Sequence, residues 1–98
     1  MPIIAQVIIR DLTPAEYDKV RDACGWLEDA PTGGHAHLTW FDGPDCHNLD
    51  AWQDEAALEA FATERLGPAM ASVGVDRVPE ITVKPAHEVY LPEAVTVT

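Results

Sequence analysis

Two histidines and an aspartate near the middle of the chain have the residue types and the spacing of an acid–base site. His35 and His37 alternate with other residues in the segment 35–41, and Asp50 lies in the following segment 46–52. If these two segments pair as a hairpin, His37 and Asp50 face each other across the strands. A carboxylate opposite an imidazole fixes its tautomer, which suits the ring to act as a general base near neutral pH. We predict that His37 and Asp50 are catalytic, and the alternative is an ordinary cross-strand pair.

The register of this predicted hairpin depends on a four-residue turn at residues 42–45. The segment Asp42-Gly43-Pro44-Asp45 has the composition of a tight turn. With this turn length, alternation along both strands places one set of pairs on a common face. The pairs expected on that face are Phe41 with Cys46, Thr39 with Asn48, His37 with Asp50 and His35 with Trp52. A shift of one residue would mix the two faces, so the predicted site depends on this turn.

Five further side chains could line a cavity beside this pair. Asn48 is a polar residue within a strand, and a buried amide needs partners or a ligand, so we assign it a catalytic role as a donor to a developing oxyanion. Trp52 could form an apolar wall of the cavity, or could simply pack in the core under a helix. His35 and Thr39 share the same face, although threonine is common in strands. Tyr17 belongs to a helix core and could turn its hydroxyl into the cavity.

The same histidines could also ligate a metal. Two imidazoles separated by one residue, as in His35-Ala36-His37, can bind a transition metal. Cys46 and His47 are near in sequence, but His47 falls on the opposite face in this register, and no third ligand has a compelling spacing. The chain also contains no glycine-rich phosphate loop, nucleophile elbow or His-Glu-x-x-His motif. We therefore predict no metal and no cofactor.

The elements that hold these residues are expected in the order β-α-β-β-α-β. The first helix has a clear start, because Thr13 is a good N-cap, a proline follows it, and Glu16 completes a capping box. The second helix begins at Asp54 and should kink or divide at Gly67-Pro68. The strands are predicted at residues 3–9, 35–41, 46–52 and 81–90, with Pro85 indicating an edge strand or a bulge, and with an extended or loose tail over residues 91–98.

This order predicts an α+β, ferredoxin-like fold in which one antiparallel sheet carries two helices on one face. Ninety-eight residues suffice for a single domain over residues 1–98 and not for two domains. The other face of the sheet would be left bare, and Leu38, Trp40 and Leu49 would all lie on it. An exposed apolar patch of this kind favours association, so we predict a homodimer that buries sheet against sheet.

The charge balance excludes several classes of function. The chain has 6 Lys and Arg against 17 Asp and Glu, a formal net charge of −11, and the basic residues are scattered. Nucleic acids and anionic membrane surfaces are bound through clustered basic residues, so neither is an expected partner. No segment has the apolar length of a membrane span, and the N-terminus lacks a signal-peptide pattern. With only two cysteines, Cys24 and Cys46, we expect reduced thiols in a cytoplasmic protein.

The element order and the segment 49–61, LDAWQDEAALEAF, resemble the dimeric α/β-barrel superfamily, and within it the antibiotic-biosynthesis-monooxygenase-like group. Members of this group often have a third strand that ends in tryptophan, then an acidic helix start, and an aromatic residue one or two turns later. The segments 64–69 and 83–87 also resemble small bacterial members. The resemblance covers nearly the whole chain, and it implies assembly as a dimeric α/β barrel.

Different branches of this superfamily imply different chemistries. The quinone-forming monooxygenases, which need no cofactor, have an asparagine four residues before the tryptophan of strand three, a spacing matched by Asn48 and Trp52. Haem-degrading members share the tryptophan and carry an asparagine on strand one. In this chain Gln6 is the imperfect counterpart of that asparagine, and the resemblance implies that Gln6 contacts the substrate. Their iron-binding histidine has no counterpart in residues 66–73, which argues against haem. The plant polyketide cyclase uses cavity histidines and a tyrosine, a part that the histidines of residues 35–37 could play, although they do not fall on its motif positions.

We therefore predict a cofactor-independent small-molecule enzyme, either a monooxygenase or a cyclase, that acts on an aromatic or polyketide-like substrate. His37, oriented by Asp50, would remove a phenolic or enolic proton. The resulting anion would react with dioxygen in a monooxygenase or attack a carbonyl in a cyclase, and Asn48 would stabilise the oxyanion. The alternative is a non-catalytic dimeric protein that binds a ligand or has a filled cavity.

Overall fold

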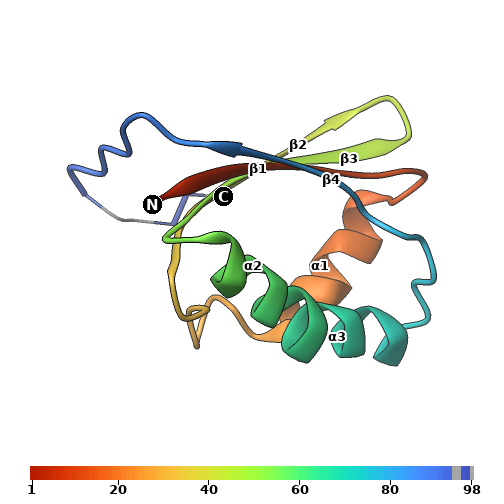
Figure 1. The fold of residues 1–98 in the computed structure, drawn as a ribbon. Helices are drawn as coiled ribbons and strands as arrows, with labels where there is room; N and C mark the ends of the chain where they lie inside the picture. The colour runs from red at the N-terminus through yellow and green to blue at the C-terminus, as the bar shows by residue number, and fades with distance from the viewer. Residues whose placement is uncertain (94–95, 98) are drawn as a thin grey trace.

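A four-stranded antiparallel sheet forms one layer of the molecule, and the helices form a second layer against one of its faces (Figure 1). The computed structural model describes residues 1–93, 96 and 97. The elements, in chain order, are β1 (Ile3–Ile9), α1 (Pro14–Cys24), β2 (Gly34–Asp42), β3 (Asp45–Trp52), α2 (Glu55–Phe61), the π-helical turn η1 (Ala62–Leu66), α3 (Gly67–Ser72) and β4 (Glu80–Pro85). The strands lie in the order β2-β3-β1-β4, so β2 and β4 are the edges. This is the predicted ferredoxin-like α+β fold.

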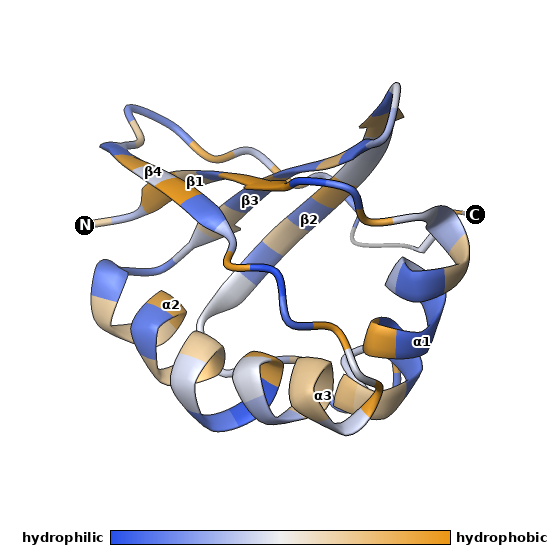
Figure 2. Ribbon diagram, turned by 90° about the vertical axis from the view of Figure 1, so that its right-hand side faces the viewer, coloured by the Kyte–Doolittle hydropathy of each residue, from blue (hydrophilic) through white to orange (hydrophobic). Residues whose placement is uncertain are grey.

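The core lies between the sheet and the helices. β1 covers the predicted residues 3–9, and its alternate side chains are buried toward the helices: Ile3, Ala5, Val7 and Ile9. The remaining core side chains come from both layers and their connections: Leu12, Val20, Cys46, Trp52, Leu58, Met70 and Val75. In Figure 2 hydrophobic and hydrophilic residues alternate along β2, as expected for a strand with two different faces.

The first helix begins as predicted. The backbone N–H of Glu16 donates to Oγ1 of Thr13 at 3.1 Å, and the backbone N–H of Thr13 donates to Oε1 of Glu16 at 3.1 Å, which completes the capping box. The helix ends at Gly25, whose φ of 73° lies in the left-handed region that glycine adopts readily. The irregular segment 25–33 then connects α1 to the edge strand β2.

α2, η1 and α3 form one helical segment with an irregular middle. It begins at Asp54, whose Oδ1 accepts the backbone N–H of Ala57 at 2.8 Å. Pro68 has no N–H to donate, and its ring would crowd the preceding turn of a regular α-helix. The wider π-turn relieves this crowding, and the N–H of Gly67 donates five residues back to the carbonyl of Ala62. The predicted kink or division at Gly67-Pro68 therefore takes the form of a π-turn.

The β2–β3 hairpin has the predicted register over most of its length. Asp42 and Asp45 pair at the turn, and Gly43 has a left-handed φ of 59°, which a tight hairpin turn requires. The predicted pairs that follow are present: Phe41 with Cys46, Thr39 with Asn48, and His37 with Asp50. The turn chemistry alone therefore sets which residues share the helix-facing side of these two strands.

The pairing differs from the prediction at the far end of the hairpin. Trp52 pairs with Gly34, and a β-bulge lies between Gly34 and Ala36, so the predicted pair of His35 with Trp52 is wrong. The physical reason is the close approach of the Pro31 carbonyl, because a Cβ on Gly34 would lie 3.3 Å from that oxygen, and it would also be in ordinary contact, at 3.5 Å, with the Trp52 ring. A residue without a side chain fits against the indole, and His35 is exposed in the bulge.

The last strand is shorter than predicted. β4 ends at Pro85 and not at Tyr90, and it occupies the edge position that Pro85 indicates. Beyond it, the backbone N–H of Ala86 donates to the carbonyl of Pro2 at 2.9 Å. Of the predicted loose tail, residues 91–93, 96 and 97 carry no helix or strand, and residues 94, 95 and 98 lie outside the described part of the chain.

The sheet face opposite the helices is exposed in the single chain, and no helix or strand of the described residues packs over it (Figure 1). Leu38 and Trp40 on this face are 57% and 47% exposed, and Leu49 is partly exposed. Trp40 stacks on His47, with ring centroids 5.3 Å apart. The chain thus has the bare apolar face on which the dimer prediction depends.

Candidate functional site

Asp50, His37 and Tyr17 form a continuous chain of hydrogen bonds that links β3, β2 and α1. Nδ1 of His37 lies 2.6 Å from Oδ1 of Asp50, and Nε2 lies 2.8 Å from the Tyr17 hydroxyl. An ionised carboxylate can only accept, so Nδ1 carries a proton and donates it to Asp50. In the neutral ring Nε2 is then an acceptor, and the Tyr17 hydroxyl donates to it.

Thr39 extends this chain to a buried amide. Its hydroxyl lies 2.9 Å from Nε2 of His37, 3.0 Å from the Tyr17 oxygen and 2.7 Å from Oδ1 of Asn48. Nδ2 of Asn48 in turn donates to the thiol of Cys46 at 3.8 Å. Asn48 is 6% exposed whereas Thr39 is only half-buried, so the amide supports the hydroxyl from within the core.

The number of hydroxyl protons in this cluster is smaller than the number of short contacts. Tyr17 and Thr39 have one hydroxyl proton each, but four short distances join these hydroxyls, Nε2 of His37 and Oδ1 of Asn48. Two protons cannot occupy four contacts, so each hydroxyl has more than one acceptor. A proton on Nε2 would fill a third contact without moving any heavy atom. The cluster can therefore hold the imidazole in either protonation state.

Access to the cluster differs along its length. The Asp50 side chain is 12% exposed and the His37 side chain is 34% exposed, so the imidazole is the more accessible member of the pair. β2 is an edge strand, which explains why this end of the layer is open. Burial raises the pKa of Tyr17 above its usual value, so the phenol keeps its proton at neutral pH and is a hydrogen-bond donor.

Aromatic side chains surround the imidazole. The ring of Trp26 lies 5.2 Å from that of His37, at an interplanar angle of 65°, and 5.9 Å from that of Tyr17. Phe41 lies 6.2 Å from Tyr17. Trp26 is not among the residues predicted from the sequence, because its position depends on the path of an irregular segment and not on a helix or strand period. These rings offer a flat apolar surface next to the imidazole.

Trp52 is buried at the end of β3, where it is 4% exposed and packs 5.3 Å from Phe61 of α2. Its Nε1–H is also buried and has no acceptor among the described residues. A buried donor without a partner is costly, and a ligand oxygen or a water molecule would satisfy it. Trp52 therefore packs in the core under a helix, as one of its two predicted alternatives had it. Its indole N–H remains without an acceptor among the described residues.

Comparison with solved structures shows that other proteins share this fold. The chain superposes on SnoaB, a cofactor-independent oxygenase from Streptomyces nogalater, with a TM-score of 0.62 and 19% identity over 94% of this chain and 97% of SnoaB. A protein of unknown function from Nitrosomonas europaea gives a TM-score of 0.65 and 20% identity over 96% and 98% of the two chains. This chain has the antibiotic-biosynthesis-monooxygenase fold.

A candidate antibiotic biosynthesis monooxygenase from Caulobacter crescentus is similar at the same level, with a TM-score of 0.64 and 16% identity over 89% of this chain and 91% of that chain. No protein-family model matches the sequence, and no curated protein sequence matches it either. The predicted resemblance to the antibiotic-biosynthesis-monooxygenase-like group is thus confirmed at the level of the fold.

Within this monooxygenase fold, two of the predicted substrate-contacting residues lie apart from the cluster. Gln6 pairs with Leu49 and is exposed on the outer face of the sheet, so it does not line the helix-facing cavity that was expected of it. The alternation of β1 turns Ala5 and Val7, and not Gln6, toward the helices. His35 lies in the bulge. The predicted residues that the structure does bring together are His37, Asp50, Asn48, Thr39 and Tyr17, and their roles stay predictions.

Metal-binding and thiol chemistry gain no support from this arrangement. In the part of the chain that the structure describes, no three or more histidine, cysteine, aspartate or glutamate side chains are grouped to hold a metal ion. Cys24 and Cys46 are free, and burial raises the pKa of both thiols, which makes each a weak nucleophile. Over the same described residues, no helix combines the length and the apolar character that a membrane span needs.

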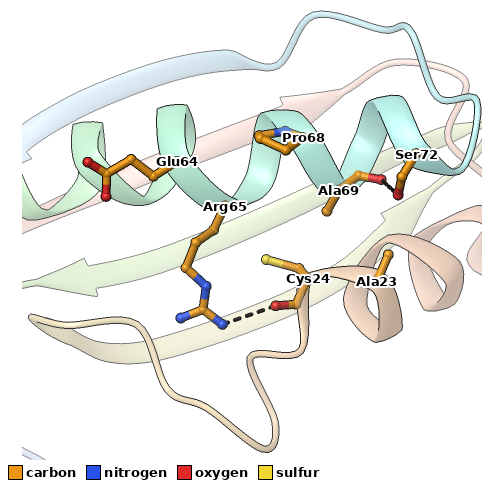
Figure 3. A pocket seen from close by; sticks show the side chains of 7 residues that line it. All are labelled: Ala23, Cys24, Glu64, Arg65, Pro68, Ala69 and Ser72. Atoms are coloured by element: carbon orange, nitrogen blue, oxygen red, sulfur yellow. Dashed lines mark hydrogen bonds between the residues drawn. The ribbon is translucent and has the colours of Figure 1, made fainter.

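Two hollows of the surface lie away from the imidazole. A cleft of about 380 Å³ separates the end of α1 from η1 and α3, and Cys24, Arg65 and Ser72 are among its lining residues (Figure 3). A smaller hollow of about 140 Å³ on the outer sheet face is lined in part by Trp40 and His47. Neither His37 nor Tyr17 lines either of them. Neither hollow therefore corresponds to the cavity expected beside His37, whose side chain is 34% exposed on the edge strand β2.

Proposed function

We propose that this protein is a cofactor-independent enzyme for small aromatic or polyketide-like molecules, acting as a monooxygenase or as a cyclase. The observation that carries the proposal is the hydrogen-bonded chain Asp50–His37–Tyr17, with distances of 2.6 and 2.8 Å. A base held in one tautomer beside flat aromatic walls suits the removal of a proton from a phenol or an enol. SnoaB, which shares the fold, is described as a cofactor-independent oxygenase.

The first step in this proposal is proton removal. The substrate proton passes to Nε2 of His37, either directly or through the Tyr17 hydroxyl, and the carboxylate of Asp50 stabilises the imidazolium that forms. The electron pair of the broken O–H or C–H bond stays on the substrate as a phenolate or enolate. The Thr39 hydroxyl donates its proton to Asn48 at 2.7 Å, so the N–H of Trp52, which has no acceptor among the described residues, is the donor that this proposal assigns to the developing oxyanion. Asn48 then acts by holding Thr39.

The second step distinguishes the two activities. In a monooxygenase the carbanion form of the substrate is oxidised by dioxygen. For an anthrone, the ring CH₂ becomes C=O and water is released, so one oxygen atom enters the product and the substrate itself supplies all the electrons. In a cyclase the same carbanion attacks a carbonyl carbon of the substrate, with no net oxidation. Neither route requires a redox cofactor.

The assembly in this proposal is a homodimer in the cytoplasm. The exposed outer face with Leu38 and Trp40 supports a dimer in which the two sheets pack together. Two free cysteines, Cys24 and Cys46, fit a reducing compartment. The net charge of −11 disfavours polyanionic ligands and leaves neutral aromatic molecules as the expected substrates.

An anthrone is the probe that tests the activity. Formation of the anthraquinone is followed by absorbance together with dioxygen consumption, after subtraction of the spontaneous rate. We expect turnover by the parent protein, a loss of about 10²-fold or more in kcat for His37→Gln, and no change for His35→Gln, the matched histidine in the bulge. Labelled dioxygen should place one oxygen atom in each product molecule.

An anaerobic arm of the same experiment separates the alternatives. Exchange of the anthrone CH₂ protons for deuterium, dependent on His37, indicates base chemistry without an oxygen step and favours the cyclase. Binding without exchange or oxidation favours a non-catalytic ligand-binding protein. That second candidate has its own support, because the Tyr17 hydroxyl already occupies Nε2 of His37 in the free protein. Equal exchange by the parent and His37→Gln would refute the assignment of the base.

A further inference from the structure

Arg65 joins the helical layer to the segment that carries Trp26. Its side chain extends from η1 across the cleft to the end of α1 (Figure 3). Nη2 donates to the carbonyl of Cys24 at 3.0 Å and to the carbonyl of Asp29 at 2.8 Å. These carbonyls stand on either side of Trp26 in the sequence, so one side chain fixes both ends of the short segment 24–29.

A guanidinium is well suited to this position. The carbonyl of Cys24 is the last of α1, at the negative end of the helix dipole, where a cation is favourable. A guanidinium stays charged and has enough N–H donors to serve two carbonyls at once. Its central carbon also lies 5.6 Å from the centre of the Phe61 ring, within the range of a cation–π contact. Arg65 thus contacts two backbone carbonyls and one aromatic ring, as expected of a side chain that holds a segment in place.

Arg65 is the contact that ties this segment to η1. The N–H of Gly25 donates to the carbonyl of Arg21 at 2.8 Å, which joins the start of the segment to α1. The N–H groups of Glu28 and Asp29 donate to the carbonyl of Gly25 at 3.2 and 2.9 Å, which fixes the shape of the turn and not its place against η1. The open cleft of about 380 Å³ beside Arg65 means that apolar packing there is incomplete. The polar contacts of Arg65 therefore supply much of the attachment.

Trp26 is the side chain that this attachment places at the site. Its ring lies 5.2 Å from that of His37 and 6.4 Å from that of Phe61, which is the ring under the guanidinium. A displacement of the segment would therefore move the indole relative to the imidazole. Arg65 itself makes no contact with His37 and would act only through Trp26.

We infer that Arg65 is a positioning residue that holds Trp26 against His37 and thereby selects flat aromatic ligands for the imidazole. With the anchor in place, the indole forms one wall of the approach to the base and keeps water from that side. Without it, the wall moves and a flat ligand loses its contact surface. The catalytic consequence rests on the proposed function, whereas the position of Trp26 can be measured without any substrate.

The test compares the NMR shift of the His37 ring protons in four forms of the full chain. Trp26→Leu removes the ring current of the indole and gives the reference value for an absent wall. Arg65→Gln is expected to move the His37 shift in the same direction, by at least half of that difference. Arg77→Gln is the matched control, because it removes a guanidinium that pairs with Glu16 at 2.6 Å, and it should leave the His37 shift unchanged.

Circular dichroism confirms that each variant is folded, and Arg65→Met, which keeps the aliphatic stem, replaces Arg65→Gln if that variant does not fold. A parent-like His37 shift in the Arg65 variant overturns the inference, and so does a parent-like shift in Trp26→Leu. With the anthrone as substrate, the Arg65 variant should raise KM about three- to tenfold and change kcat less. If the parent does not oxidise the anthrone, the proposed function fails while the NMR shifts still decide the role of Arg65.

Discussion

Tyr17 is the residue whose removal most sharply tests how a substrate proton would reach His37. Tyr17→Phe deletes one oxygen, which lies 2.8 Å from Nε2 of His37 and 3.0 Å from Oγ1 of Thr39, and keeps the ring. If the hydroxyl passes the proton from substrate to imidazole, its loss removes the contribution of an acid–base group, about 10²–10⁴ in kcat. This corresponds to about 3–5 kcal/mol of transition-state stabilisation.

The stability of the Tyr17→Phe variant should change far less than its activity. The lost hydrogen bond contributes about 1 kcal/mol net, since the phenol is only partly buried. For a domain of 98 residues this lowers Tm by about 4–8 °C. Because burial raises the pKa of Tyr17, the phenol stays protonated at neutral pH, and the relay works by concerted transfer and not through a standing phenolate.

The assay is steady-state oxidation of an anthrone, with Tyr90→Phe as the matched control because Tyr90 is exposed in the irregular C-terminal segment. The control should keep the kcat of the parent. An unchanged or higher kcat for Tyr17→Phe would refute the relay. It would mean that the Tyr17 hydroxyl merely occupies Nε2 of His37, and that the substrate displaces this hydroxyl and contacts His37 directly.

Three further predictions concern assembly, cofactor and acid stability. Trp40→Glu places a charge on the bare sheet face and should convert a dimer into monomer or aggregate by light scattering, whereas Val78→Glu at an exposed site outside the sheet should not. Haemin should give no saturable Soret shift at micromolar protein, and tight stoichiometric binding would contradict the reading of residues 66–73. The hydrogen bond from Arg77 lowers the pKa of Glu16 below 4.5. The stability that this interaction contributes is therefore present above pH 4.5 and is lost as the pH falls through the lowered pKa. Arg77→Met should reduce this loss of stability at acid pH, measured by denaturant titrations.

The hairpin shows why part of the site could be predicted from sequence. The turn at residues 42–45 has the glycine and proline that a two-residue connection needs, and the strand period of two then carries the register along both strands. His37 and Asp50 are each five positions from the turn, close enough for the register to hold. The first helix was predictable for a similar reason, because Thr13 and Glu16 form the capping box within four residues.

The residues that prediction missed depend on contacts between distant segments. The bulge at His35 leaves Gly34 opposite Trp52 and close to the carbonyl of Pro31, an arrangement that no local pattern encodes. Trp26 reaches the imidazole because Arg65, thirty-nine positions later, anchors its segment. Gln6 was assigned through a resemblance to other proteins, and the alternation of β1 places it on the wrong face. Tertiary contacts thus decided the first two cases, whereas the strand period of β1 itself contradicts the assignment of Gln6.

The distribution of polar residues over the helix-facing side of the sheet supports the proposal that the cluster around His37 is a functional site. On this side β1 is wholly apolar, with Ile3, Ala5, Val7 and Ile9, so the layer can be filled without polar groups. β2 and β3 instead carry the hydrogen-bonded cluster around His37, where each polar group must keep a partner or cost stability. That cluster lies at one edge of the sheet, because β2 is the edge strand and pairs with another strand, β3, on one side only. A fixed imidazole, aromatic side chains beside it and an open edge together support the proposed site for small flat molecules.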